Sequence, residues 1–323
     1  MSMPSTNSID IKLTLAPDGV AIPYIARFWM FLVSDILSLM CCVFVLYYFL
    51  FDSTLRRGLY NHVFIVVLFL CIIWELTIIP WIMHIYFYNV VWIQSQTFCI
   101  IWKFIQSLIY TTIPKLVGWA SVERNILIYH YQLVSTKKKR IIIHYIPIIL
   151  ILIYSIVLYA IITPINDCKR IFSYNTITCG YVSCTYNSAT YALYEFFSGG
   201  ILSSCCIGFG SASLIIRNMY QKHRLQRQIH WRKHRKMTIQ LLSVASIFYV
   251  LFLPRVVFGI TEELNVQPSF DAVYNRYASF FAYYIVFLLP FACAGTLPQL
   301  RKRLLKVFGC SWRQRQMRVI AVQ

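Results

Sequence analysis

Seven long runs of hydrophobic residues, separated by short polar connections, dominate this sequence. A helix rises about 1.5 Å per residue and the hydrocarbon core of a bilayer is about 30 Å thick, so roughly 20 apolar residues cross it. The pattern predicts an all-α membrane protein, a seven-helix transmembrane bundle, with spans near Tyr24–Phe51, Asn61–Phe87, Cys99–Tyr131, Ile141–Thr163, Ser188–Ile216, Met237–Ile260 and Asp271–Leu297. Prolines within the runs predict kinks: Pro80, Pro114, Pro147, Pro254 and Pro290.

Composition and charge support a membrane protein and predict its orientation. The chain is 59% hydrophobic and 13% charged, whereas soluble domains are about 45–50% apolar and about 25% charged. The net charge of +19 lies in short basic blocks between the hydrophobic runs, so we expect no nucleic-acid partner. Most Lys and Arg residues lie in alternate connections and in the C-terminal tail. The positive-inside rule therefore predicts an extracellular N-terminus (residues 1–23) and a cytoplasmic C-terminus at the plasma membrane.

The segment after the bundle (residues 24–297) has its own pattern. Leu300, Leu304 and Phe308 repeat every four residues with basic residues between them. This predicts a short amphipathic helix over 298–308, on anionic lipids of the inner leaflet, followed by a basic tail to residue 323. Cys310 follows the helix and is a candidate for palmitoylation; an unmodified cysteine is the alternative.

The third run places polar groups at both ends of one helix. From Cys99 to Arg124 there are 25 positions, or roughly 37 Å of helix. Cys99, Gln106 and Arg124 fall on nearly one face, because their spacings are close to whole numbers of turns. We therefore expect this helix to connect the two sides of the membrane.

Four cysteines are predicted on the outer side, where disulfides form: Cys99, Cys168, Cys179 and Cys184. At least one bridge should connect the loop between spans four and five to the start of span three. Four cysteines allow three connectivities. We favour Cys99–Cys184 with Cys168–Cys179, and Cys99–Cys179 is the alternative.

These features resemble the rhodopsin-like (class A) G protein-coupled receptors. In that family a cysteine begins the third helix and Asp/Glu-Arg-Tyr ends it, as Glu123-Arg124-Asn125 does here with Asn in the last place. The sixth-helix motif Cys-Trp-x-Pro is similar to Leu251-Phe252-Leu253-Pro254. Of the seventh-helix motif Asn-Pro-x-x-Tyr only Pro290 remains, and no Asp lies near Cys71, where the family has the Asp of its sodium site. The resemblance runs from about Tyr24 to Phe308.

The resemblance implies a receptor for an extracellular ligand that activates a heterotrimeric G protein. It implies that Glu123 holds Arg124 at rest and that an opened cytoplasmic crevice frees Arg124. Pro254 and Pro290 would be hinges and Phe252 the floor of the pocket. The sixth span has no acid near Arg124. The alternatives are an Arg124 that reaches the headgroups, static kinks, and an ordinary core aromatic at Phe252.

The ligand pocket implied by the resemblance lies in the outer half of the bundle. Gln106 stands where amine receptors carry an Asp, so we expect a peptide or a non-amine small molecule. Tyr110 shares its face, and Arg255 and Glu195 are the other candidates. Arg255 and Glu195 form either a structural salt bridge or, through Arg255, a site for an anionic ligand. Residues 271–297 contain no Lys, which disfavours retinal, and we expect no cofactor.

Two other function classes fit less well. A transporter or channel commonly shows repeats or a series of charges along its path, and this sequence shows neither. A membrane enzyme needs a buried catalytic or metal set. The seven His residues lie at the ends of spans or in inner loops, so we expect neither a metal site nor an enzyme.

Overall fold

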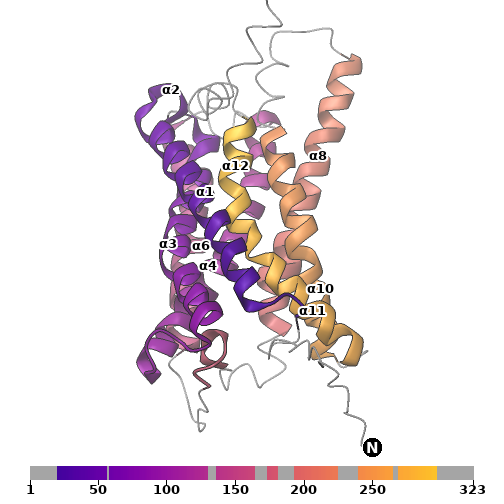
Figure 1. Cartoon of the computed structure of the whole chain (residues 1–323). Coiled ribbons are helices and arrows are strands. Elements are labelled where there is room, and N and C mark those ends of the chain that lie inside the picture. Colours follow the sequence, from indigo (N-terminus) through magenta and orange to yellow (C-terminus); the bar gives the residue numbers. More distant parts are fainter. Residues whose placement is uncertain are drawn as a thin grey trace, which may run out of the picture.

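The helices of this protein run side by side as a single bundle (Figure 1). The structure is a computed structural model that describes residues 20–56, 58–129, 136–163, 173–180, 193–224, 239–264 and 268–296. Every regular element among these residues is helical. Seven described segments run along the bundle, and each matches a predicted span, with ends that differ by up to eight residues: Tyr24–Phe51, Leu59–Tyr88, Gln96–Tyr129, Lys137–Ile162, 193–224, 239–263 and 268–296.

The first three long helices are α1 (Tyr24–Phe51), α3 (Leu59–Tyr88) and α4 (Gln96–Tyr129). The short α2 (Ser53–Arg56) connects α1 to α3. The α4 helix begins three residues before Cys99, after Ser95, whose Oγ accepts from the backbone N–H of Phe98 and caps the first turn.

The later spans are built from shorter pieces, several of them π-helical. Span four contains α5 (Lys137–Arg140), η2 (Ile141–Tyr145) and α6 (Ile146–Ile162). Span five contains η4 (Phe196–Ile201) and α8 (Leu202–Arg224). Span six contains residues 239–247, η5 (Phe248–Phe252) and α10 (Leu253–Glu263). The π-turns η2 and η5 end shortly before Pro147 and Pro254, where the missing N–H disturbs the helical ladder.

The seventh span bends at a place that its sequence does not predict. Its two helices, α11 (Pro268–Ala282) and α12 (Tyr284–Thr296), meet at Tyr283 with a 42° bend. Pro290, where the sequence predicts a kink, lies within α12 and not at this bend. The physical reason lies in the bundle. The Tyr283 hydroxyl accepts from Gln106 Nε2 at 3.1 Å, and its ring lies 5.9 Å from that of Trp74. These contacts draw the break toward the core.

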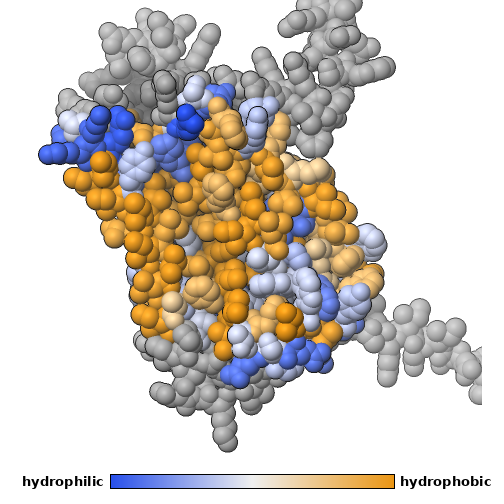
Figure 2. Space-filling view, turned by 90° about the vertical axis from the view of Figure 1, so that its left-hand side faces the viewer, coloured by the Kyte–Doolittle hydropathy of each residue, from blue (hydrophilic) through white to orange (hydrophobic). Residues whose placement is uncertain are grey.

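The surface carries a broad hydrophobic band between two hydrophilic rims (Figure 2). Among the described residues, five helices are long and apolar enough to cross a membrane, and the bent pair α11–α12 makes a sixth. The remaining span, α4, is less apolar because it contains Lys103, Gln106 and Lys115. Exposed side chains of the other helices cover the band; Val250, for example, is 69% exposed.

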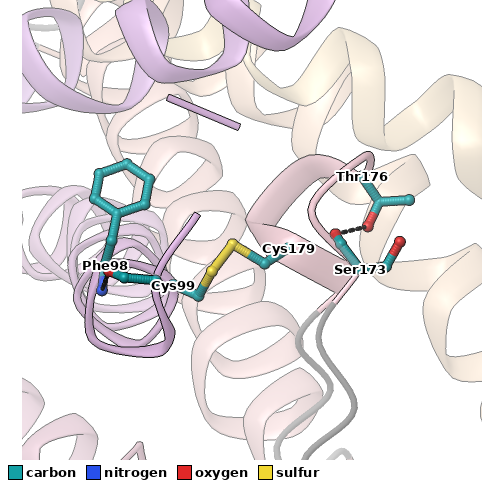
Figure 3. The surroundings of a disulfide bond; sticks show 6 residues. Phe98, Cys99, Ser173, Thr176 and Cys179 are labelled. Carbon is teal, nitrogen blue, oxygen red and sulfur yellow. Dashed lines mark hydrogen bonds between the residues drawn. A yellow bond between two sulfur atoms is a disulfide. The ribbon is translucent and has the colours of Figure 1, made fainter. Parts of the chain in front are cut away.

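One disulfide ties a loop to the start of α4 (Figure 3). It joins Cys99 to Cys179, with 5.8 Å between their Cα atoms. The favoured pairing of Cys99 with Cys184 is therefore wrong, as is the pairing of Cys168 with Cys179; the alternative, Cys99–Cys179, is the one formed. Cys168 and Cys184 lie outside the described residues.

The loop around Cys179 explains the pairing. Its backbone is held by the bond from Val91 N to Tyr174 O at 2.8 Å, and by the bond from Ser173 N to Cys179 O, also at 2.8 Å. The 3₁₀ turn η3 (Ile177–Gly180) then brings Cys179 over α4. We call this side of the bundle the disulfide end and the opposite side the Arg124 end. The predicted amphipathic helix at 298–308 and Cys310 lie outside the described residues.

Candidate functional site

Arg124 lies inside the bundle near the end of α4. Its side chain is 1% exposed, and its guanidinium carbon lies 4.9 Å from the ring centroid of Phe64. Its Nη2 donates to the amide oxygen of Gln240 at 3.0 Å, and Gln240 is fully buried on the sixth span. A buried charge-assisted hydrogen bond thus connects spans three and six, where the sequence offered no acid.

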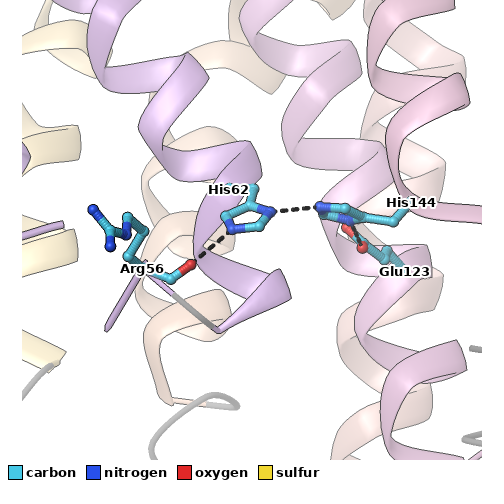
Figure 4. Close-up of polar contacts among 4 residues, drawn as sticks. All are labelled: Arg56, His62, Glu123 and His144. Carbon is cyan, nitrogen blue, oxygen red and sulfur yellow. Dashed lines mark hydrogen bonds and ion pairs between the residues drawn. The ribbon is translucent and has the colours of Figure 1, made fainter. Parts of the chain in front are cut away.

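Glu123, the neighbour of Arg124, takes part in a second chain of contacts (Figure 4). Its carboxylate pairs with Nδ1 of His144, from η2. Nε2 of His144 lies 2.9 Å from Nδ1 of His62, and Nε2 of His62 lies 2.8 Å from the backbone oxygen of Arg56. The chain therefore joins span three to spans four and two at the Arg124 end.

The acceptors in this chain determine where its protons lie. A carbonyl oxygen only accepts, so His62 Nε2 carries a proton and donates to Arg56. A neutral His62 then accepts through Nδ1 from the Nε2–H of His144. The contact between His144 Nδ1 and Glu123 also needs a proton, because two lone pairs repel. The pair is therefore either imidazolium with carboxylate or imidazole with carboxylic acid.

Sequence reasoning missed this histidine pair, because it judged each His only by its nearness to the end of a span. His62 follows the start of α3 by three residues, and His144 lies within η2. The available signal was that His62 and His144 both lie close to the ends of their spans on the same side of the membrane, the Arg124 end. Both ring nitrogens of His144 are engaged, so neither is available to a metal. Within the described ranges no cluster of His, Cys, Asp and Glu is arranged to hold a metal ion.

Asn125, the third residue of the triplet, connects α4 to α8. Its Nδ2 donates to the backbone oxygens of Ser121 and Gly210, each at 2.9 Å. The helices approach closely here, because a Cβ on Gly210 would lie 2.8 Å from Cβ of Ser121. Asn125 stands where the resembled motif has an aromatic residue, and it connects spans three and five through these hydrogen bonds.

The candidates Gln106, Tyr110 and Phe252 lie together in the interior. Gln106 donates to Tyr283, as described above. Tyr110 packs against Phe252, with their ring centroids 5.6 Å apart. Below them is a narrow apolar cavity of about 20 Å³, with room for the centre of about one water molecule. Its walls include both aromatic residues together with Trp74, Pro114 and Phe248. Phe252 thus stands at the junction of spans three and six.

Arg255 and Glu195 form no ion pair with each other. Glu195 Oε1 accepts from the Tyr159 hydroxyl at 2.7 Å. Arg255 Nη1 donates to Oδ1 of Asn275 at 2.7 Å, and its guanidinium carbon lies 5.4 Å from the Phe196 ring. The alternative of a structural salt bridge is therefore wrong.

Sequence reasoning also missed Lys103. This half-buried residue lies on α4 between Cys99 and Gln106, and the charges of Glu195 and Arg255 both act on it. Lys103 lies three residues before Gln106 and therefore on the same, pocket-facing side of the helix. This spacing could have identified it from the sequence. The charge of Glu195 also acts on Lys115, whose Nζ lies 5.1 Å from the centroid of the Tyr154 ring. Cations therefore outnumber acids in this part of the described structure.

The comparisons with known proteins support the fold. No family model and no curated protein matches the chain. Among solved structures it is similar to the crystal structure of squid rhodopsin, with a TM-score of 0.66 and 16% identity. The match covers 91% of this chain and 87% of that one. The chain is therefore a multi-pass membrane protein with the rhodopsin-like seven-helix fold of class A receptors.

Proposed function

We propose that this protein is a G protein-coupled receptor of the plasma membrane, with the disulfide end extracellular and the Arg124 end cytoplasmic. The observation that carries the proposal is the buried bond from Arg124 to Gln240. It connects spans three and six across the face where a G protein would bind. Because the bond lies inside the bundle, Arg124 reaches a partner only after the sixth span moves away.

The sixth span has the parts for such a movement. The π-turn η5 ends two residues before Pro254, and both features weaken the helical ladder where a hinge is needed. Phe252 ends this turn and touches Tyr110, so a ligand that displaces Tyr110 would shift the sixth span. At the Arg124 end, the exposed block Lys137–Arg140 faces the anionic lipids of the inner leaflet.

The ligand class follows from the charges in the outer half. Gln106 is neutral and already donates to Tyr283, so it offers an ammonium group no counter-charge. Arg255 supplies a cation beside Phe196, whereas the nearby acid Glu195 accepts from the Tyr159 hydroxyl. We propose a non-amine ligand with an acidic group, such as a peptide with a free C-terminal carboxylate. The seventh span has no Lys for retinal.

The test is a ligand screen in cells that carry reporters for several G protein classes. Peptides with free C-termini are screened beside the same peptides with amidated C-termini, on the wild type and on Arg124→Ala. We expect a response to a free-acid ligand that Arg124→Ala abolishes at equal surface expression. Arg255→Leu should weaken the ligand more than Arg255→Lys does.

Three results would count against parts of this proposal. A response that survives Arg124→Ala would remove the role given to the central bond. Flux of a substrate through the purified protein in liposomes, with silence in every reporter, would favour the transporter or channel instead. A preference for amidated or amine ligands would refute the ligand class while leaving the coupling intact.

A further inference from the structure

A lysine lies in the middle of the membrane, on the side of α4 that faces away from the ligand candidates. Lys115 comes nine positions after Gln106, which puts the two on opposite faces of the helix. It also comes nine positions before Arg124, or roughly 14 Å along the helix. Lysines near helix ends extend to the headgroups, but Lys115 is far from both ends of α4.

The amine of Lys115 has no hydrogen-bond acceptor among the described residues. Its Nζ lies 5.1 Å from the centroid of the Tyr154 ring on α6. Glu195 is the acid whose charge acts on Lys115, but it forms no ion pair with the lysine and accepts instead from the Tyr159 hydroxyl at 2.7 Å. An amine at this depth is costly unless it finds a partner. The missing partner is an acceptor.

The ring beside this amine belongs to a pair of tyrosines at the lipid-facing surface. Tyr154 on α6 is 40% exposed and Tyr194, at the start of span five, is 45% exposed. Their hydroxyls bond to each other, and one proton serves that bond. The other hydroxyl therefore still has a proton to donate. On the same surface of α6, Ile153 and Val157 are half exposed and offer an apolar strip.

These groups define the chemistry of a ligand. The amine and the spare hydroxyl both donate, so the ligand must supply acceptor oxygens, and the apolar strip fits a hydrocarbon chain. Phospholipids keep their permanently charged phosphates in the headgroup layer, well away from the middle of the hydrocarbon core. A fatty acid can instead enter the core as the neutral acid, and its carboxyl group then supplies the acceptor.

We propose that Lys115, together with the Tyr154–Tyr194 pair, binds the carboxyl group of a long-chain free fatty acid of the bilayer, with the chain against α6. The acid enters in its neutral form, and its carboxyl proton passes to the neutral amine. The product is an ammonium–carboxylate pair without net charge, in which the carboxylate also accepts from a tyrosine hydroxyl. The inference rests on the fold and on these contacts, so it stands or fails independently of G protein coupling.

Photo-crosslinking of the full-length protein in nanodiscs tests the site. A fatty acid that carries a diazirine in its chain is irradiated with the protein, and mass spectrometry locates the label. We expect label on α6 around Ile153 and at the start of span five. Oleic acid should remove this label at a mole fraction roughly 10–100-fold lower than oleyl alcohol, which has the same chain but no carboxyl group. Equal competition by the alcohol, or label spread evenly over the lipid-facing helices, would overturn the proposal.

Variants assign the preference for the acid. Lys115→Met keeps an unbranched chain but removes the amine, so oleic acid should compete no better than the alcohol. Lys139→Met makes the same change at an exposed lysine of the Arg124 end and should keep the preference. The double change Tyr154→Phe with Tyr194→Phe should weaken it by about 2–10-fold. A preference for the acid that persists in Lys115→Met would refute the site. The wild-type comparison of acid and alcohol decides even if a variant fails to fold.

Discussion

Replacing Gln240 tests most directly whether its bond to Arg124 holds the resting state. Gln240→Leu keeps a buried side chain of similar size but removes the acceptor of Arg124 Nη2. Gln240→Glu keeps the shape and adds a negative charge toward the guanidinium. The two variants should therefore move the equilibrium between resting and active states in opposite directions.

The magnitude follows from the bond itself. A hydrogen bond to a charged group contributes about 1.5–3 kcal/mol, and both partners here are almost fully buried. If the bond exists only at rest, its loss multiplies the ratio of active to resting protein by roughly 10–100, since about 1.4 kcal/mol is tenfold. From an active population of about 1%, Gln240→Leu should raise basal activity to about 10–50%. Gln240→Glu should lower it, because a bond between two charges is stronger.

The assay is basal signalling without ligand in cells that carry the reporters described above, at matched surface expression. A second readout is the unfolding midpoint of the purified variants, which separates a change in activity from poor folding. Equal basal activity in the wild type, Gln240→Leu and Gln240→Glu, in a chain that responds to a ligand, would refute this reasoning. A rise in both variants would show that packing at position 240, rather than the bond, determines the equilibrium.

Three further changes test other parts of the structure. His144→Leu leaves the buried Glu123 without its proton-sharing partner, so we expect a loss of about 1–3 kcal/mol, which the unfolding midpoint of the purified variant checks. Cys179→Ser opens the bridge that spans 80 positions and should cost about 2–4 kcal/mol, with a reducing agent destabilising the wild type and not the variant. Gly210→Ala forces a Cβ to within 2.9 Å of backbone in α4 and should cost about 1–3 kcal/mol. Gly295→Ala, with nothing within 4 Å, is its control, and equal unfolding midpoints would contradict the packing argument.

The helices of this fold could be predicted because their signal is local. A run of apolar residues long enough to cross a bilayer must form a helix there, since its backbone groups find no other partners. Tyr24–Phe51 was therefore predicted to the residue, and Pro23 directly precedes its first turn. Prolines did not mark every bend. The 42° bend of the seventh span falls at Tyr283, between α11 and α12, where the sequence has no proline.

The partners within the candidate site could not be predicted, because they join residues far apart in the sequence. Gln240 lies 116 positions from Arg124, and His144 lies 82 positions from His62. Nothing in the local pattern distinguishes Gln240 from any other polar residue near the end of a span. The prediction of the disulfide pairing failed for the same reason. Cys179 and Cys184 are equivalent by compartment, and the hydrogen bonds that position the turn before Cys179 decide between them.

The contacts of α4 share a property that bears on how firmly the resting state is held. Its polar positions Gln106, Arg124 and Asn125 each bond to a neutral group, namely a phenol hydroxyl, an amide and a backbone oxygen. Of these contacts only that of Arg124 includes a charge; it contributes about 1.5–3 kcal/mol, whereas a bond between neutral groups contributes about 0.5–1.5 kcal/mol. The pair Glu123–His144 joins span three to span four. In the receptor that we propose, the sixth span must move for a G protein to enter, and one bond of this size leaves a small active population. A measurable basal activity is therefore expected of the unmodified chain.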